Sequence, residues 1–243
     1  MEMKKLLFLM LLIPFLAQSQ NDGSKLLNMS EITVKYGHES EFIEGVKLWK
    51  KCYLENKGTD KFNVWRRVQG EGVVYVLTGM MDNWAEMDKE DAPGKVCRKT
   101  ITDLIMPHVE NVNYNISRTM PEVSRTTPAE GTKLVSVSFF RVENSTVFND
   151  VIKETSATMK LAEGSIRGTW YSFVGGGPDS PNYMVSIPYK NFGDLDVTRD
   201  GVWKIYEDKH GKEKTDELRA IFRASLKNFW SYLYSLNEEL SNQ

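Results

Sequence analysis

Three histidines, His38, His108 and His210, are the side chains of this 243-residue chain best suited to bind a metal ion or to carry a proton near neutral pH. His108 is the main candidate because it lies at helical spacing on the inward side of an expected helix. The other two adjoin glycines, and we interpret them as exposed turn residues. No two of the three have the spacing of metal ligands, so the sequence argues against zinc. A hydrogen-bonded structural role is the competing interpretation of His108.

The sequence contains no recognisable motif for nucleophilic catalysis or phosphate binding. It has no Gly-x-Ser-x-Gly turn. A glycine-rich stretch at residues 175–177 lies between two expected strands and lacks the lysine of a phosphate-binding loop, so we interpret it as a hairpin.

The last expected strand of each half of the chain carries side chains of opposite character. In the second half, Trp230, Tyr232 and Tyr234 alternate onto one side of the strand, and in the first half Asn113 and Asn115 occupy the corresponding side. If the two sides meet, they enclose a pocket with an aromatic and an amide wall, which suits a small planar or apolar molecule. The competing interpretation is that these aromatic residues fill a core.

Apolar periodicity predicts the elements that must position these residues. The expected strands are residues 28–36, 62–68, 73–79 and 111–118 in the first half, and 134–141, 166–174, 183–187 and 229–236 in the second. The expected helices are residues 40–58, 93–108, 144–164 and 202–227, the last one interrupted at residues 210–211. Each half therefore has the order β-α-β-β-α-β.

Residues 75–88 and 183–196 read as copies of one another. At a constant offset of 108 residues they share a tyrosine, an apolar strand, an asparagine before an aromatic residue, and a final aspartate. Such self-similarity is typical of one supersecondary unit present twice. We therefore expect a first unit over residues 20–124, a linker over residues 125–131 and a second unit over residues 132–243.

Each β-α-β-β-α-β unit predicts a four-stranded antiparallel sheet with both helices on one face, the ferredoxin-like arrangement of the α+β class. The bare apolar face of each sheet would then be covered by the other sheet. With this element order and duplication, nearly the whole chain resembles the dimeric α/β-barrel superfamily, in the tandem form that makes one intramolecular barrel. That superfamily includes cofactor-free monooxygenases, haem-handling enzymes, stress-responsive proteins and many proteins without an assigned activity.

The resemblance implies roles for three residues of this chain. In haem enzymes of the superfamily a histidine of the barrel scaffold binds the iron, which makes His108 a candidate haem ligand. In a cofactor-free monooxygenase pattern, asparagine and tryptophan assist oxygen activation, which assigns those roles to Asn115 and Trp65 by analogy. The sequence contains none of the diagnostic catalytic signatures of these enzymes, and fold alone does not establish function.

The first nineteen residues have the features of a cleaved signal peptide. Lys4 and Lys5 precede the apolar run 6–13, and Ala17 and Ser19 supply the small residues of a cleavage site. The run is too short to span a bilayer, so we expect a periplasmic or secreted protein without membrane contact after cleavage. A net charge of −2 without a basic stripe argues against nucleic-acid binding.

Cys52 and Cys97 are the two cysteines of the chain. In an exported protein an even pair suggests a disulfide, whereas the competing interpretation is two buried thiols on helix faces.

Taken together, these features predict an exported small-ligand-binding α/β-barrel protein, as a monomer or a homodimer. A cofactor-free or haem-dependent oxygenase of the same barrel type is the alternative. A third hypothesis is an interaction module that dimerises through free sheet edges or helices.

Overall fold

The computed structural model describes residues 23–127 and 129–243, and the expected signal peptide lies outside them. These residues form a mixed α+β fold around a closed barrel of antiparallel strands in the order β1-β3-β2-β8-β5-β7-β6-β4. The strands are β1 (Leu26–Val34), β2 (Asn63–Arg67), β3 (Val73–Met81), β4 (Val109–Thr119), β5 (Leu134–Val142), β6 (Thr169–Phe173), β7 (Tyr183–Tyr189) and β8 (Leu226–Leu236).

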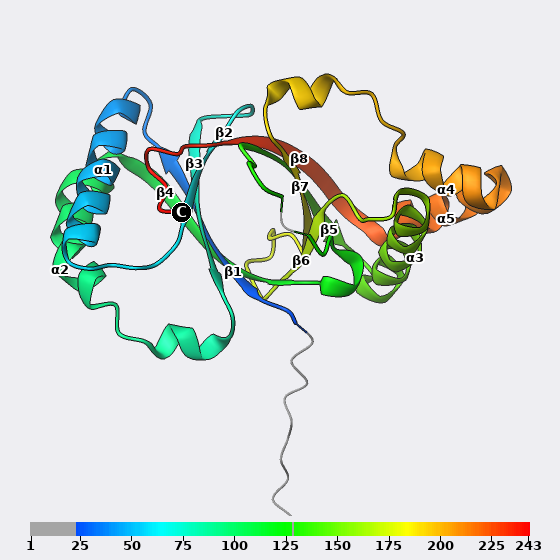
Figure 1. Cartoon of the computed structure of the whole chain (residues 1–243), viewed down its shortest axis with the longest axis horizontal. Coiled ribbons are helices and arrows are strands. Elements are labelled where there is room, and N and C mark those ends of the chain that lie inside the picture. Colours follow the sequence, from blue (N-terminus) through cyan, green and yellow to red (C-terminus); the bar gives the residue numbers. More distant parts are fainter. Residues whose placement is uncertain (1–22, 128) are drawn as a thin grey trace, which may run out of the picture.

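The helices lie outside the barrel on two opposite sides (Figure 1). On one side are α1 (Glu39–Glu55) and α2 (Ala92–Thr100), and on the other α3 (Ser145–Glu163), α4 (Val202–His210) and α5 (Lys212–Ser225). This arrangement leaves the inner face of the barrel free of helices. None of the helices within residues 23–127 and 129–243 is both long and apolar enough to cross a bilayer.

The two halves of the sheet meet edge to edge. Strand β2 pairs with β8 through Trp65–Leu236 and its neighbours, and β4 pairs with β6 through Ser117–Phe173 and its neighbours. Edge pairing satisfies the backbone groups that open sheet edges would leave exposed. The two halves thus close edge to edge into the expected single barrel, and inner-face residues of both halves pack in one apolar cluster across it.

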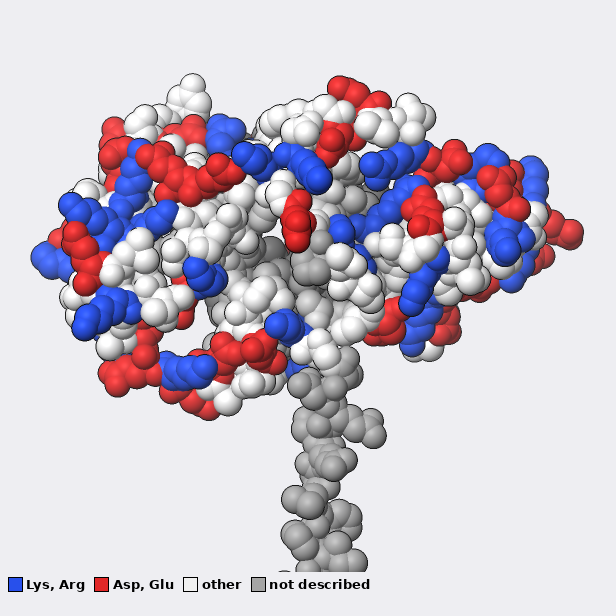
Figure 2. All heavy atoms as spheres, in the orientation of Figure 1, with Lys and Arg blue, Asp and Glu red and all other residues white. Residues whose placement is uncertain are grey.

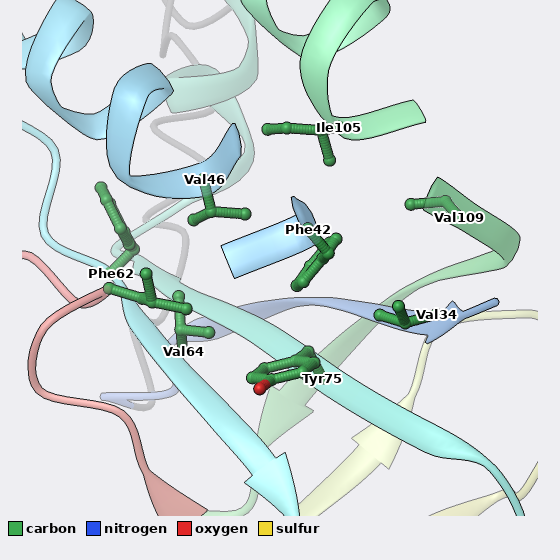
Figure 3. Packing of buried hydrophobic residues seen from close by; sticks show 9 residues of the cluster. Val34, Phe42, Val46, Phe62, Val64, Tyr75, Ile105 and Val109 are labelled. Carbon is green, nitrogen blue, oxygen red and sulfur yellow. The ribbon is translucent and has the colours of Figure 1, made fainter. Parts of the chain in front are cut away.

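On the outer face of the first half, helix α1 packs on strand β3. The ring of Phe42 lies 5.0 Å from that of Tyr75, centroid to centroid, and both side chains are almost fully buried (Figure 3). Val46, Ile105 and Val109 belong to the same cluster. The apolar residues Phe42, Val46, Trp49 and Tyr53, spaced 4, 3 and 4 residues apart along α1, thus form the side of the helix that faces the core.

The second half has an equivalent contact between its own helix and strand. Phe148 of α3 lies 4.9 Å from Tyr183 of β7, and Phe148 is fully buried. Phe140, Trp170 and Phe222 complete an aromatic cluster around it. This side of the molecule is more densely aromatic than the first.

Short 3-10 helices follow β3 and β7 within the two stretches that read as copies in the sequence. They span Trp84–Asp88 and Phe192–Asp196. In each, the preceding asparagine caps the turn: the side chain of Asn83 accepts a hydrogen bond from the Ala85 amide, and that of Asn191 accepts one from the Asp194 amide.

The second expected helix is shorter and less regular than its apolar spacing predicts. After α2 the chain makes a π-helical turn over Ile101–Ile105 and a 3-10 turn over Met106–His108 before β4 begins. Pro107 supplies no amide hydrogen to an α-helix, which accounts for the change of turn type at this point. The helical region expected at residues 202–227 is divided at Gly211 (φ 83°), as the sequence indicates, but it ends at Ser225.

A disulfide between Cys52 and Cys97 joins α1 to α2, with Cα atoms 5.9 Å apart. Cys97 is buried, and α2 has few other buried residues to hold it against α1.

Candidate functional site

The inner face of the barrel follows from the strand register. Neighbouring strands place residues of one row on the same face, and side chains alternate along each strand. Glu31 of β1 pairs with Val76 and Asn113, and Met29 pairs with Thr78 and Asn115. Across the barrel, Phe139 of β5 pairs with Trp230 and Met184. The inward residues form one apolar cluster that includes Leu27, Val74, Val76, Val137, Phe139, Met184 and Tyr234.

A cavity of about 1810 Å³ opens at the end of the barrel where the linker crosses it. Its inner walls include Met29 of β1, Trp65 of β2, Val137 of β5, Tyr171 of β6 and Tyr234 of β8. Figure 2 shows a hollow near the middle of the molecule with mostly uncharged atoms at its floor, while acidic and basic side chains alternate around it. An aromatic and aliphatic lining of this kind suits an apolar or planar small molecule.

Linker residues form part of the rim of this cavity. Arg125, Thr127 and Gly131 line it on the side where the two halves join. The guanidinium of Arg125 donates to the carbonyl of Thr127, 2.7 Å away, which fixes the linker backbone at the opening. The linker therefore helps to enclose the cavity besides connecting the two halves.

The cavity continues into a groove on the outside of the first half. There it is lined by Trp49 and Tyr53 of α1, by Leu77 of β3, and by Met87 and Pro93 beyond it. The indole Nε1 of Trp49 is buried and has no hydrogen-bond partner among the described residues. The corresponding side of the second half holds the aromatic cluster around Phe148.

The structure places all six residues predicted to bind a ligand on the inner face, but in three groups. Trp65 and Tyr234 line the cavity, and the indole of Trp65 donates to the hydroxyl of Thr78 at 3.0 Å. Trp230 and Tyr232 lie toward the opposite end and pack on Phe139, with ring centroids 5.5 and 6.5 Å from it. At this end the aromatic residues contribute to a core, which was the competing interpretation.

Asn113 and Asn115 share the row of inner residues but do not line the cavity. Strand β4 pairs with β6 only at its end, from Ser117 to Thr119. The earlier part of β4 pairs with β1 alone, which leaves Asn113 exposed and Asn115 half-buried. The predicted amide wall is therefore an opening in the side of the barrel.

Glu31 and Arg67 are inner-face residues that the sequence analysis missed. Arg67 pairs with Tyr234 across the β2–β8 seam, and its guanidinium lies 4.6 Å from the centroid of the Tyr232 ring. Its Nη2 donates to the carbonyl of Glu71, whereas its buried Nε has no partner among the described residues. Alternation along residues 28–36 was visible in the sequence, and placing Glu31 with the inward apolar residues would have identified it.

Burial governs the protonation of these inner residues. Desolvation raises the pKa of Glu31 above the ordinary glutamate value of 4.5, and the positive charge of Arg67 opposes the rise. Desolvation, reinforced by the charge of Glu31, raises the pKa of Tyr234. Desolvation raises the pKa of Tyr171 to about 12. The tyrosines are therefore neutral near pH 7, and Glu31 takes up a proton more readily than an exposed carboxyl does.

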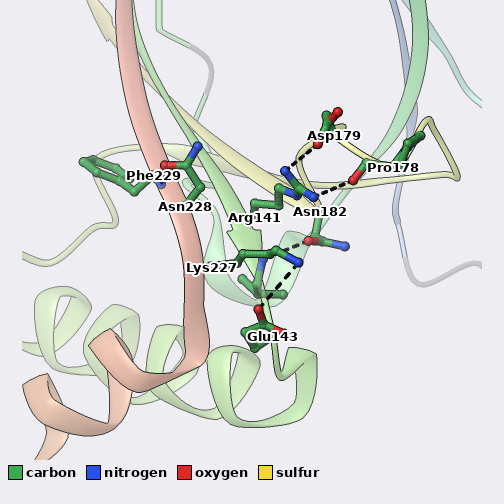
Figure 4. Close-up of polar contacts among 9 residues, drawn as sticks. Arg141, Glu143, Pro178, Asp179, Asn182, Lys227, Asn228 and Phe229 are labelled. Carbon is green, nitrogen blue, oxygen red and sulfur yellow. Dashed lines mark hydrogen bonds and ion pairs between the residues drawn. The ribbon is translucent and has the colours of Figure 1, made fainter.

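The loop between β6 and β7 is anchored at the end of the barrel away from the linker (Figure 4). Arg141 donates to the carboxylate of Asp179 at 2.8 Å and to the carbonyl of Pro178 at 2.6 Å. The side chain of Asn182 accepts from the amide of Val142. The glycine-rich stretch thus forms the expected connection between two strands and is held by Arg141.

The histidines lie away from the cavity. No histidine is among the residues that line it, and Nδ1 of His108 lies 3.0 Å from Nδ1 of His38. His210 bonds to the hydroxyl of Thr158 at 2.9 Å instead of lying free in a turn. His108 therefore does not fit the role of iron ligand to a haem in this cavity. Among residues 23–127 and 129–243, no group of three or more His, Cys, Asp or Glu side chains is arranged to hold a metal ion.

Comparisons with known proteins identify relatives by structure alone. No protein-family model and no curated protein sequence matches the chain. A mutant chlorite dismutase from Candidatus Nitrospira defluvii matches with a TM-score of 0.53 at 8% identity, covering 89% of this chain and 92% of that one.

Two further structures match over similar lengths. A monooxygenase-like protein from Lactobacillus acidophilus has a TM-score of 0.52 at 11% identity, covering 88% of this chain and 94% of that one. An anthrone oxidase-like protein has a TM-score of 0.51 at 7% identity, covering 88% and 92%. At these identities the likeness shows the fold: the chain has the α+β barrel architecture of monooxygenase-like and chlorite dismutase proteins.

Proposed function

We propose that this protein binds a small planar or apolar molecule in its barrel cavity and does so outside the cytoplasm. The cavity, about 1810 Å³ together with the adjoining groove, has an aromatic and thioether lining, and this observation carries the proposal. Export is supported by the signal-peptide pattern of residues 1–19 and agrees with the disulfide between Cys52 and Cys97.

We also propose that the two halves are tandem ferredoxin-like units derived from one ancestral unit. The helix–strand contacts Phe42–Tyr75 and Phe148–Tyr183 occur at equivalent places, with offsets of 106 and 108 residues. The capping asparagines Asn83 and Asn191 also correspond at 108 residues. In this view the second half kept a filled aromatic core, and the first half kept space for the groove beside α1.

Native mass spectrometry of the tag-free protein, purified from its own source, tests the binding proposal. The expected result is a bound small molecule that is released by organic solvent. Ser186 lines the cavity, so Ser186→Phe should displace the molecule by filling part of its space. Ser231 is exposed on β8, so Ser231→Phe makes the same chemical change outside the cavity and should leave the molecule bound.

Two results would contradict binding in the cavity. One is a wild-type protein that carries no small molecule and takes up none from a lipid and aromatic extract of its source. The other is a bound molecule that Ser186→Phe and Ser231→Phe affect equally.

A cofactor-free oxygenase is the second candidate function. It is favoured by Glu31, an inner-face carboxyl next to the cavity-lining Ser30, whose desolvation raises its pKa above the ordinary glutamate value. In such a reaction Glu31 removes a proton from an activated ring carbon of the substrate. One atom of O₂ then becomes the new carbonyl oxygen, and the other leaves as water. Asn115 of β4 and Trp65 of β2 both face the interior of the barrel. Strands β1 and β3 lie between β4 and β2, so the two side chains are not on neighbouring strands.

Oxygen uptake with anthrone, a planar substrate with an acidic C–H bond, tests this second function. Uptake by the wild type is expected to be lost in Glu31→Gln, which keeps the shape but removes the base. Glu41→Gln alters an exposed glutamate of α1 and should retain activity. Equal rates in wild type and Glu31→Gln would exclude Glu31 as the base. No step of either proposal passes through haem.

A further inference from the structure

The β1–α1 turn and the start of β4 bring two histidines together on the surface of the first half. Nδ1 of His38 lies 3.0 Å from Nδ1 of His108, although 70 residues separate them in the chain. The two rings are inclined by 38°, with centroids 5.2 Å apart, so they meet through their nitrogen atoms. His38 is exposed and His108 half-buried, which leaves the paired nitrogens open to solvent from one side.

Backbone hydrogen bonds fix both residues in place. The carbonyl of His108 accepts from the amide of Lys35 at 2.9 Å. The amide of His38 donates to the carbonyl of Lys35 at 3.1 Å, and the carbonyl of His38 accepts from the amide of Phe42 as α1 begins. Both turns are thus tied to residue 35, and Phe42 is held in the core beneath them. The backbone therefore holds the two histidines as close neighbours.

The distance between the two Nδ1 atoms is compatible with both nitrogens binding one metal ion. Imidazole nitrogens bind divalent zinc or copper at about 2.0–2.1 Å. Two such bonds that meet at an angle between a right angle and a tetrahedral one place the nitrogens about 2.9–3.4 Å apart. The observed 3.0 Å lies in this range. A hydrogen bond between two neutral imidazoles would have a similar length, so experiment must separate the two.

We propose that His38 and His108 form a surface site for a divalent transition metal, bound through their two Nδ1 atoms with water completing the coordination. Neutral imidazole suits copper and zinc, and copper(II) binds most strongly among the divalent ions of its row. Lys35 lies beside the site with its ammonium on the carbonyl of Pro107 at 2.7 Å. Its positive charge opposes a metal ion, so the site is expected to favour the ion with the strongest nitrogen bonds.

Metal binding here would clamp the β1–α1 turn to the junction between the 3-10 turn Met106–His108 and β4. These two connections meet only through the Lys35 backbone bond, the Lys35 side chain and the histidine pair among the contacts described above. The site is independent of the proposed cavity, because neither histidine lines it. Loss of one function therefore need not affect the other.

Titration of the tag-free chain with copper(II) and zinc, by calorimetry and by electron paramagnetic resonance of the copper form, tests the site. We expect one copper ion per chain, a spectrum with two coupled nitrogens, and a rise in melting temperature on binding. His38→Ala and His108→Ala should each abolish the one-to-one binding. His210→Ala is the matched control and should keep it, because His210 bonds to Thr158 on the other half.

The proposal makes one further demand. Lys35→Met removes the neighbouring positive charge, so copper should bind more tightly to this variant than to the wild type. The proposal is overturned if no one-to-one binding occurs, if binding survives in His38→Ala and His108→Ala, or if His210→Ala loses it equally. If copper raises the melting temperature of neither the wild type nor His210→Ala, the histidine pair is only a hydrogen bond.

Discussion

The guanidinium of Arg67 lies over the ring of Tyr232, 4.6 Å from its centroid, at the seam where strand β2 of the first half pairs with β8 of the second. The same guanidinium is close enough to Glu31 to lower the pKa of that carboxyl against the effect of desolvation. The seam therefore places a charged pair within an interior that is otherwise aromatic and aliphatic.

Replacing Glu31 with glutamine should stabilise the protein near neutral pH. The folded-state pKa of Glu31 is raised, so its contribution to stability is complete below the unfolded value of 4.5 and is lost as the pH rises through the folded pKa. Glutamine does not ionise, so Glu31→Gln avoids the free-energy cost of a buried carboxylate at higher pH. Its melting temperature should exceed that of the wild type near pH 7, and the difference should shrink as the pH falls below 4.5. A variant that is less stable than the wild type at neutral pH would contradict this assignment.

Replacing Arg67 with methionine should destabilise the barrel at neutral pH, because it leaves the Glu31 carboxylate without its nearby positive charge. The loss should be smaller in the Glu31→Gln background. Urea unfolding of the four proteins in this double-mutant cycle is expected to give a coupling of about 0.5–3 kcal/mol. Additive effects of the two substitutions would mean that the charges do not interact.

Reduction of the disulfide should lower the free energy of unfolding. The bond joins residues 45 apart, for which the chain-entropy relation gives about 4 kcal/mol. The Cys52→Ser, Cys97→Ser double variant should therefore unfold at lower urea concentration than the oxidised wild type. Dithiothreitol should shift the wild type toward the variant and leave the variant unchanged. Coincident unfolding curves with and without reductant would show that the bond contributes nothing.

The two helix–strand contacts should be of similar energetic importance. Phe42→Ala and Phe148→Ala each empty a site in a buried cluster and should cost about 3–5 kcal/mol. Leu161→Ala on α3 is the control, because that side chain is 77% exposed and should change stability by no more than about 0.5 kcal/mol. Calorimetric melting of the three variants measures this. A mild effect at one phenylalanine alone would show that the two halves do not share one packing plan.

Local patterns in the sequence predicted most of the fold. The alternation of Trp230, Tyr232 and Tyr234 placed β8 and its inner face correctly, and the two stretches that read as copies each contain a strand followed by a 3-10 turn that an asparagine caps. These features depend on residues within a few positions of one another. Side-chain alternation and capping hydrogen bonds act at that range, so a sequence can reveal them.

The candidate site was only partly predictable. Trp65 and Tyr234 line the cavity, but Asn113 was assigned to an inner wall and is exposed, because β4 pairs with β6 over a few residues at its end. The length of that pairing depends on two strands from different halves. No pattern within either strand records it.

The sequence by itself determined the order of the elements, their inner and outer faces, and the aromatic character of the interior. Only the tertiary structure decided that the halves join edge to edge, that Arg67 reaches Tyr232, and that His38 meets His108. The physical reason is one of range. Periodicity reports which side of an element avoids water, whereas the partners that an element meets are selected by closure of the whole barrel.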